Sequence, residues 1–348
     1  MTITSVSTAY LSNSMLPAIT QADAQLTQLE TEQTTGQYAD LGVQLGGSSG
    51  YELSLRNSDD LLQTITTANS IVSGALATTD DALTSVTTTA NSTLKTLISW
   101  VSGASTNADL GVAGDDSMAS LVTAANSTYD DQYVFGGINS ATAPMKALSA
   151  STGATALADD FLNQFGFSPT SAAASGVTAD QMTSFLNGSF ASEFSNANWT
   201  SNFSSASSTN TTAEIAPGQT VQTSTNLNAG GFQPLTQAYA MLSMLGDSSL
   251  SSAAKQVVVT TAEGLITQGL SQVTAIGSQL GQTKTQLTQA DDDMSTQMTL
   301  MKTQIGGLDN VDANQVATQL SSLTTQIEAA YQITAQLQKL SLAQYLPA

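Results

Sequence analysis

Apolar residues recur every three or four positions along four stretches of the chain, and this spacing predicts long amphipathic helices. The two terminal stretches run from Leu11 to Leu29 and from Val316 to Leu346. The two longer stretches run from Leu53 to Val101 and from Ser251 to Ile305. The order of helix, long helix, insert, long helix and helix is nearly symmetric about the middle of the chain.

Each terminal stretch places its apolar side chains on one face of a helix whose other face is Gln, Thr and Ser. Asp312, three residues before Gln315, is an N-cap signal for the C-terminal helix. A long helix with so narrow an apolar stripe gains most of its stability by packing that stripe on a partner. We therefore expect the two ends to meet, within one molecule or between neighbours, with ordinary bundle packing as the alternative to an assembly role. The expected assembly seams comprise Leu11, Met15, Leu26, Leu29, Val316, Leu320, Leu323, Ile327 and Leu337, with Ala18, Ala22 and Ala330 between them.

The segments that join these helices are shorter and richer in glycine. Leu41, Val43 and Leu45 alternate within a glycine-rich stretch and predict a short extended piece. Residues 103–116 are expected to form a loop before a helix at Ser117–Tyr129. A strand is expected at Tyr133–Phe135, followed by a turn at Gly136–Gly137. In the insert we expect helices at Leu157–Phe165 and Ala179–Leu186, and weak strands at Asn198–Phe203, Ala213–Ala216 and Thr220–Thr225 with a turn at Pro217–Gly218. Pro234 is expected to open a further helix, and Gly306–Gly307 to end the second long one.

These elements predict a mainly α fold: a long antiparallel helical bundle or coiled coil formed by both chain ends, with a β-hairpin and a small inserted mixed α/β domain. The expected division has three parts. A terminal coiled-coil domain comprises 1–37 and 312–348, a helical-bundle domain with the hairpin comprises 38–145 and 232–311, and an inserted surface domain comprises 146–231.

Composition narrows the classes of function. The chain has 348 residues, of which 41 % are hydrophobic and only 10 % charged, and Ser, Thr, Gln and Asn fill the polar faces. Uncharged polar surfaces pack against copies of themselves without burying many charges, which is compatible with a subunit of a large assembly. The net charge of −20 disfavours nucleic acid and anionic membranes as partners. We expect no membrane-spanning helix and no cleaved signal peptide.

The residues needed for common catalytic and metal sites are missing from the sequence. Histidine and cysteine are both absent, which excludes Ser-His-Asp and Cys-His catalysis, disulfides and thiolate or imidazole metal sites. Acidic doublets such as Asp80-Asp81 are expected to be solvated helix faces, because adjacent residues on a helix point about 100° apart. We therefore expect no enzyme activity, no catalytic residues, no bound metal and no cofactor.

Four segments resemble a known family. They are TEQTTGQYADLGVQLGGSSGYELSLRNSDDLLQTITTANSIV, YDDQYVFGGINSATAP, AGGFQPLTQAYAMLSML and QVATQLSSLTTQIEAAYQITAQLQKLSLAQYL, in this order at the two ends of the chain. Together they resemble the flagellin superfamily, and within it the hook–filament junction proteins, hook-associated protein 3, of alphaproteobacterial type. The stretch from Tyr133 to Pro144 follows the junction pattern, whereas the Arg-rich and Asp-Asp-Ala-Ala-Gly elements of filament flagellins have no match after the first helix.

The resemblance implies a structural subunit of the bacterial flagellum, extracellular and exported unfolded through the flagellar type III apparatus. It implies self-association in a ring or helical assembly, hook-associated protein 1 and flagellin as neighbours, and an export chaperone on the C-terminal helix. The alternative within the family is the filament flagellin itself. An alternative of another class is a surface-exposed adhesive or glycan-binding protein that acts through the aromatics of the insert.

Overall fold

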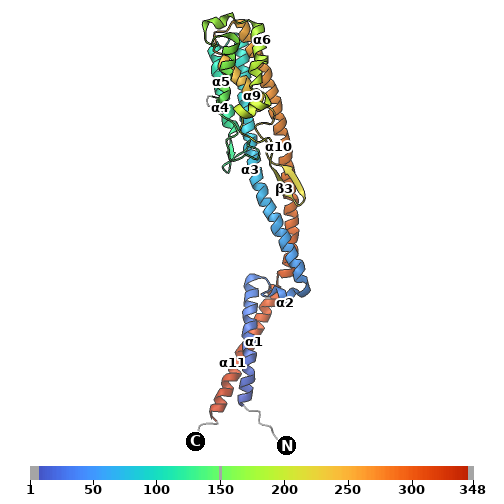
Figure 1. The fold of residues 1–348 in the computed structure, drawn as a ribbon. Helices are drawn as coiled ribbons and strands as arrows, with labels where there is room; N and C mark the ends of the chain where they lie inside the picture. Colours follow the sequence, from blue (N-terminus) through green and yellow to red (C-terminus); the bar gives the residue numbers. More distant parts are fainter. Residues whose placement is uncertain (1–7, 149–150, 344–348) are drawn as a thin grey trace. The chain divides into compact units, whose positions relative to one another are not determined.

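Figure 1 shows the computed structural model. It describes the backbone of residues 8–148 and 151–343, and the burial of the side chains of residues 15–148 and 151–336. Long helices come from both ends of the chain and two small antiparallel sheets accompany them, so the prediction of a mainly α helical bundle is confirmed. The chain forms two compact units, which we call the terminal unit, Met1–Leu61 with Ser295–Ala348, and the central unit, Leu62–Met294. The division into three domains stays a prediction.

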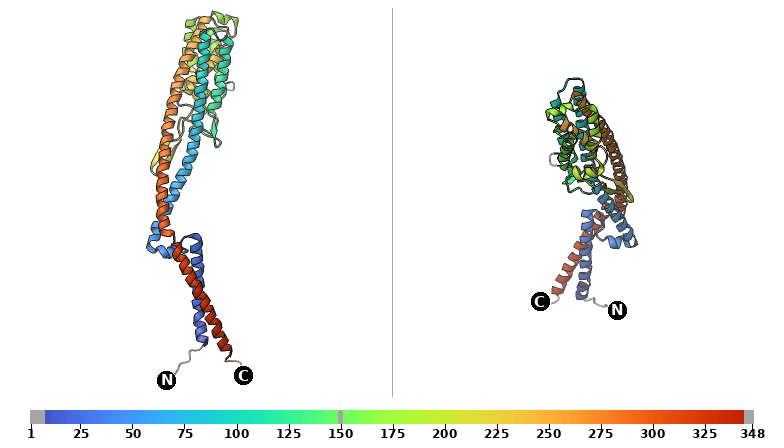
Figure 2. Two further views of the ribbon diagram at one scale, coloured as in Figure 1. Left: turned by 180° about the vertical axis from the view of Figure 1, so that it is seen from behind. Right: turned by 45° about the horizontal axis from the view of Figure 1, so that its top comes forward.

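The terminal unit is built around two antiparallel helices, α1 (Thr8–Thr35) and α11 (Ala313–Ala343), which lie side by side in the views of Figures 1 and 2. The predicted cap of α11 is confirmed, because Oδ1 of Asp312 accepts the N–H groups of Asn314 at 2.9 Å and Gln315 at 3.3 Å. The predicted continuation of this helix to Leu346 lies outside the described residues. Helices α1 and α11 therefore pair within one molecule.

Two local predictions in the terminal unit are wrong. Residues Leu41–Leu45 form a short helix, α2, rather than an extended piece, because the Asp40 side chain caps it by accepting the Val43 N–H at 2.9 Å. A 3-10 turn, η1 (Gly46–Ser48), then leads into α3 (Ser49–Val101). Helix α10 (Ser252–Asp309) continues through Gly306–Gly307 and ends where the Asp309 carbonyl accepts the Tyr38 N–H at 2.9 Å. A tertiary hydrogen bond, rather than the glycine pair, thus marks its end.

The central unit packs the long helices α3 and α10, as their spacing predicts, with α4 (Asn107–Ala125) and α9 (Phe232–Leu245) in one hydrophobic core. Helix α4 begins ten residues before its predicted start at Ser117, so the loop prediction is wrong there. The missed signal is a capping box: the Asp109 N–H donates to Oγ1 of Thr106 at 3.3 Å, and the Asp109 carboxylate accepts the Thr106 N–H at 2.6 Å.

The predicted hairpin lies next to its predicted position. Strands β1 (Thr128–Tyr129) and β2 (Gln132–Tyr133) are antiparallel, and the turn between them is Asp130–Asp131. The predicted turn at Gly136–Gly137 is also present, after β2, where the Asn139 N–H donates to the Gly136 carbonyl at 3.1 Å. Both aspartates have positive φ, 48° and 58°, the conformation that a tight two-residue hairpin turn requires. Aspartate tolerates this conformation better than most residues, so the turn forms without glycine.

The insert contains short helices and one β-hairpin. The helices predicted at Leu157–Phe165 and Ala179–Leu186 are confirmed, and so is the Pro217–Gly218 turn, in which Gly218 has a φ of 77°. The strand predicted at Asn198–Phe203 is wrong, because this segment is helical. The elements are α5 (Thr152–Phe165), η3 (Ala172–Gly176), α6 (Ala179–Asn187), α7 (Ser189–Ser192), α8 (Asn196–Asn202), β3 (Thr212–Ala216) and β4 (Gln219–Gln222).

Helices α4 and α9 cross closely because glycine lies on their facing sides. A Cβ atom on Gly114 would lie 2.3 Å from the backbone nitrogen of Ser243, and one on Gly246 would lie 2.6 Å from the backbone nitrogen of Gly111. Both distances are shorter than any normal contact. The crossing therefore depends on the absence of side chains at these positions, which lets the two backbones approach.

We expect Gly114→Ala to lower the free energy of unfolding by about 1–3 kcal/mol, because the added methyl group must push α4 away from α9. Gly264→Ala in α10 is the matched control, since a Cβ there meets no atom within 4 Å. It should raise the free energy of unfolding by about 0.5–1 kcal/mol through helix propensity alone. Urea unfolding followed by circular dichroism measures the free energy of unfolding of both variants. An equal increase in the two variants would contradict a tight crossing of α4 and α9.

Candidate assembly site

The apolar rows of α1 and α11 pack against each other along the helix pair. Of the expected seam residues, Val316 and Ile327 are buried, at 4 % and 8 % exposure. Leu11 and Leu337 lie within their helices, but their side chains fall outside the described residues. The remaining seam residues are partly buried: Met15, Leu26, Leu29, Leu320 and Leu323. The described members of the two seams are thus buried or partly buried on two helices that contact each other, and their role in assembly stays a proposal.

One position of the α1 row differs from the expected pattern. Ala18 is exposed, whereas Ile19 is partly buried and continues the row between Met15 and Ala22. The 4-3-4-3 spacing of a helical stripe is kept with Ile19, because it lies four residues after Met15 and three before Ala22. The spacing of the sequence permits either Ala18 or Ile19 in the row, and in the structure the larger Ile19 is the one that is partly buried.

The outer faces of the helix pair carry large apolar side chains that this chain leaves uncovered. Leu16 is 61 % exposed, Tyr331 52 % and Ile333 50 %. Charges are few: α1 has three carboxylates and no basic residue, and α11 has only Glu328 and Lys339. Exposed apolar side chains on a nearly uncharged surface are typical of a face that becomes buried against another protein.

A groove of 470 Å³ runs between the two helices. Its polar lining is neutral, which suits hydrogen bonding to a similar uncharged helix rather than recognition of an ion. The lining comprises Gln25, Gln28, Leu29, Gln319, Ser322, Leu323 and Gln326.

Backbone hydrogen bonds fasten the helix pair to the turn after α1. The Val311 N–H donates to the Gly36 carbonyl at 3.0 Å, and Gln37 forms an antiparallel bridge with Asn310. Glu32 is 5 % exposed, and its Oε1 accepts the Gln28 amide at 3.0 Å and the Ala39 N–H at 3.2 Å. These bonds satisfy a buried carboxylate without a cation.

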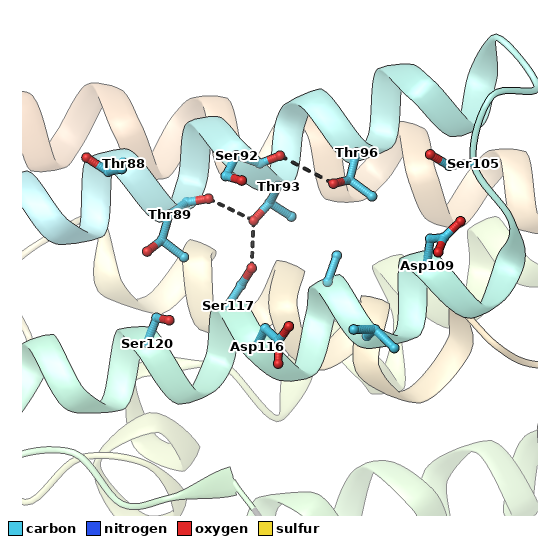
Figure 3. A pocket seen from close by; sticks show the side chains of 12 residues that line it. Thr88, Thr89, Ser92, Thr93, Thr96, Ser105, Asp109, Asp116, Ser117 and Ser120 are labelled. Carbon is cyan, nitrogen blue, oxygen red and sulfur yellow. Dashed lines mark hydrogen bonds between the residues drawn. The ribbon is translucent and has the colours of Figure 1, made fainter.

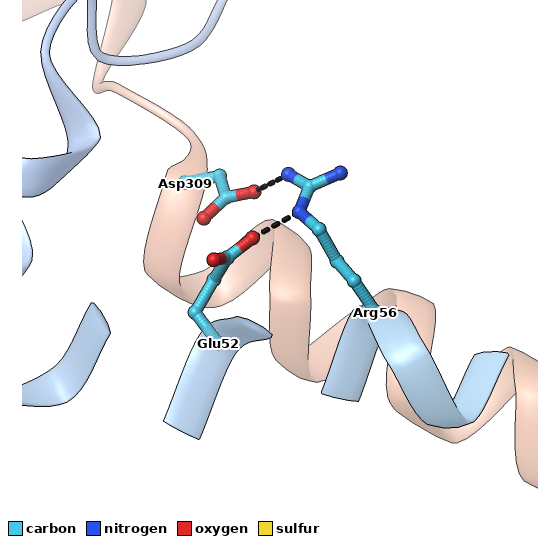
Figure 4. Close-up of polar contacts among 3 residues, drawn as sticks. All are labelled: Glu52, Arg56 and Asp309. Atoms are coloured by element: carbon cyan, nitrogen blue, oxygen red, sulfur yellow. Dashed lines mark hydrogen bonds and ion pairs between the residues drawn. The ribbon is translucent and has the colours of Figure 1, made fainter. Parts of the chain in front are cut away.

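The only arginine of the chain holds two further acidic side chains in the terminal unit (Figure 4). Arg56 of α3 donates one hydrogen bond to Glu52, one turn before it, and another to Asp309 at the end of α10. Asp309 is fully buried and Glu52 is 8 % exposed. The hydrogen bond to Glu52, with the charges of both carboxylates, raises the pKa of Arg56 above its usual value. Sequence reasoning missed this cluster, and the signal was the single Arg among 27 acidic residues.

Comparison with known proteins places the chain in a family. A family model of the bacterial flagellin N-terminal helical region matches residues 6–140, and a model of the bacterial flagellin C-terminal helical region matches residues 264–346. Together the two matches span more than half of the chain. The chain belongs to the flagellin superfamily. It is therefore a structural protein of the extracellular bacterial flagellum, in a family whose members self-assemble.

Solved structures agree with this fold. The structure of a Vibrio parahaemolyticus protein described as a flagellar hook-associated protein has a TM-score of 0.52 and 12 % sequence identity. The similarity covers 75 % of this flagellin-superfamily chain and 97 % of that chain. No protein with a curated description matches the chain significantly. Over residues 8–148 and 151–343, no helix combines the length and apolar character needed to cross a bilayer.

In this superfamily member a cavity lies between α3 and α4 (Figure 3). The cavity measures 680 Å³, and hydroxyl groups dominate its lining. Thr93 donates to the Thr89 carbonyl at 2.9 Å, so the 2.7 Å contact with Ser117 uses the Ser117 hydroxyl as donor. The hydrogen bond from the Thr106 N–H lowers the pKa of Asp109, which forms the capping box of α4 with Thr106. No group of three or more acidic side chains among the described residues is arranged to hold a metal ion.

The aromatic residues of the insert form its core rather than an exposed platform. Their rings contact one another in a continuous series, from the pair Phe161–Phe165 to the pair Trp199–Phe203. Trp199 and Phe203 lie four residues apart at the α8 end, which puts both rings on the same side. The rings with at most 2 % exposure are Phe161, Phe185, Phe190, Phe194, Trp199 and Phe203. Buried rings cannot stack on a sugar, so these residues give no support to a glycan-binding role.

We expect Arg56→Leu to lower the free energy of unfolding by about 2–3 kcal/mol, because it strands the buried carboxylate of Asp309 without a cation. Lys302→Leu is the control: Lys302 lies 4.0 Å from Asp59, is 60 % exposed, and should contribute less than about 1 kcal/mol. Thermal unfolding at pH 7 compares them. Arg56→Leu combined with Asp309→Asn should regain part of the loss, and equal effects of the two leucine variants would contradict a role for the cluster.

Two carboxylates of the insert make its stability depend on pH. Burial, followed by the charge of Asp159, raises the pKa of Asp160; burial, followed by the charge of Asp160, raises the pKa of Glu193. A raised pKa in the folded state means that stability is greatest below the unfolded pKa and is lost as pH rises through the folded pKa. Asp160→Asn should therefore raise the Tm at pH 7 and give no such gain at pH 4. Asp180→Asn, at an exposed position of the insert, is the control. A gain at pH 4 as large as that at pH 7 would contradict the prediction.

Proposed function

We propose that this protein is the junction adaptor between hook and filament, assembled after type III export, as its resemblance to the hook–filament junction proteins implies. The observation that carries the proposal is the exposed apolar surface of the terminal helix pair, which includes Leu16 of α1 and Ile333 of α11, on helices with few charges. In the assembled flagellum, neighbouring copies cover this surface in a ring or helical array. The half-buried seams, Leu26 and Leu323 among them, then lie at the centre of larger helix clusters.

The partners follow from this position. Hook-associated protein 1 lies on one side and flagellin on the other, while the export chaperone holds the C-terminal helix before assembly. The uncharged Gln, Ser and Thr faces of α1 and α11 suit neighbours with the same composition, since such contacts bury few charges. Absence of cysteine is compatible with export of an unfolded chain, because no disulfide must form or break on the way.

The filament subunit is the second candidate within the superfamily. The match to both flagellin terminal regions supports the filament subunit and the junction protein equally. The sequence from Tyr133 to Pro144 favours the junction protein. The two functions differ in one physical property. A filament subunit polymerises with itself without limit, while a junction protein stops and needs different neighbours on its two sides.

We expect a strain that lacks this protein to assemble hooks without filaments and to release monomeric flagellin into the medium. Ile333→Asp, which adds a charge to the uncovered face, should not restore filaments, whereas Gln332→Asp, an adjacent exposed residue with the same added charge, should restore them. Electron microscopy of the cells and immunoblotting of the medium measure both outcomes.

Circular dichroism of the purified variants provides the control, because Ile333→Asp should retain the helix content of the unaltered protein. Normal filaments in the deletion strain would contradict a junction role. Normal filaments with Ile333→Asp would contradict burial of this face. Polymerisation of the purified protein alone into long filaments would assign it as flagellin instead.

A further inference from the structure

The β3–β4 hairpin of the central unit is anchored firmly at its root. Asn226 follows β4 and is 4 % exposed, and its amide donates to Oδ1 of Asn210 at 2.7 Å. The next residue, Leu227, is fully buried in the main core, and its N–H donates to the Phe135 carbonyl at 2.9 Å. These contacts join the base of the hairpin to the bundle.

The far part of the hairpin contacts the long helices through a small apolar cluster centred on Ile215, against which Ala216 and Val221 of the hairpin and Val72 of α3 also pack. The strand register pairs Glu214 with Thr220 and Ala216 with Gln219, so the intervening Ile215 forms a β-bulge. A bulge turns a side chain away from the normal alternation of a strand. Ile215 is fully buried against Leu287 and Ala290 of α10, in a small apolar cluster separate from the main core. Figure 1 shows β3 lying beside α10.

A single amide connects this part of the hairpin to both long helices. The Asn69 side chain of α3 donates one hydrogen to the Ile215 carbonyl at 2.9 Å and the other to Oδ1 of Asp291 of α10 at 2.6 Å. Asn69 is fully buried. The carboxylate fixes the amide orientation, because the reverse orientation would place Oδ1 of Asn69 against an acceptor. Asn69 therefore ties α3, β3 and α10 together at one point.

Two polar atoms at this point have no protein partner. Oδ1 of Asn69 and Oγ1 of Thr66 are both buried and accept or donate no hydrogen bond within the described chain. Thr66 lies three residues before Asn69, on the same face of α3. A buried polar atom without a partner opposes the state that buries it, since water would bond to it in an open state. The small Ile215 cluster and the Asn69 bonds thus offset two unfavourable groups, which leaves the attached state only weakly favoured.

We propose that the β3–β4 hairpin is a releasable strap: its root stays in the main core while Ile215 and Asn69 attach and detach its far part from α3 and α10. Release exposes Ile215, hydrates Thr66 and Asn69, and removes the hydrogen-bonded link between the two long helices. The main core, which holds α4 and α9, is unaffected. This device stands whether the protein serves as junction or filament subunit.

Hydrogen–deuterium exchange of the full chain, followed by mass spectrometry, tests the strap. Amides of β3 and β4 should exchange faster than those of α9, which reports on the main core. Thr66→Val keeps the side-chain shape and removes the unpartnered hydroxyl, so it should slow exchange in the hairpin about tenfold. Asn69→Ala removes the link and should speed that exchange about tenfold. In every variant α9 should exchange as in the unaltered protein.

Thr67→Val is the matched control, because Thr67 is exposed and its hydroxyl donates to the Gln63 carbonyl at 2.8 Å. It should leave hairpin exchange unchanged. The strap is overturned if the hairpin exchanges as slowly as α9 in the unaltered protein. It is also overturned if Thr66→Val leaves hairpin exchange unchanged or makes it faster, as it would if an ordered water bonded the hydroxyl. If Asn69→Ala also changes amide exchange in α9, the comparison of Thr66→Val with Thr67→Val still tests whether the hairpin is released.

Discussion

The pairing of two helices from opposite ends of the chain is the interaction on which the terminal unit depends. Each helix has an apolar row too narrow to stabilise it alone, so α1 and α11 are stable as a pair because Val316 and Ile327 are buried against the N-terminal row. The same pair leaves Leu16 and Ile333 exposed. The buried apolar positions thus hold α1 and α11 together, and the exposed ones remain available for contacts with neighbouring molecules. An assembly subunit needs both.

Low charge explains how the rest of the structure is held together. With 7 basic residues against 27 acidic ones, ion pairs can stabilise few places, and the one arginine is used where Glu52 and Asp309 are buried. Elsewhere neutral amides take this role. Asn126 donates to the Met145 carbonyl and accepts the Met145 N–H, both at 2.9 Å. Hydrogen bonds between neutral groups are insensitive to salt, which suits a protein of the extracellular flagellum.

The insert is joined to the bundle by its packing. Its buried rings, including Phe161 and Phe203, belong to the same hydrophobic core as Leu97 and Leu121 of the long and short bundle helices. The β3–β4 hairpin has a separate apolar cluster. The insert therefore stabilises the central unit with its aromatics.

The sequence by itself determined the long helices and the cap at Asp312, because helical spacing and capping are local patterns that a few neighbouring residues establish. The superfamily was indicated by the resemblance of four segments. The sequence failed where distant residues decided the outcome. Helix α10 passes Gly306–Gly307 and ends at Asp309, where Tyr38 supplies the hydrogen bond. Asp309, one of the two partners of Arg56, lies 253 residues away from it, and Asn69 bonds to Asp291 and Ile215 on two other elements. Only the tertiary structure shows which buried polar groups gain a partner and which do not, because a hydrogen bond requires atoms within about 3 Å, and sequence order does not fix that distance for residues on different elements.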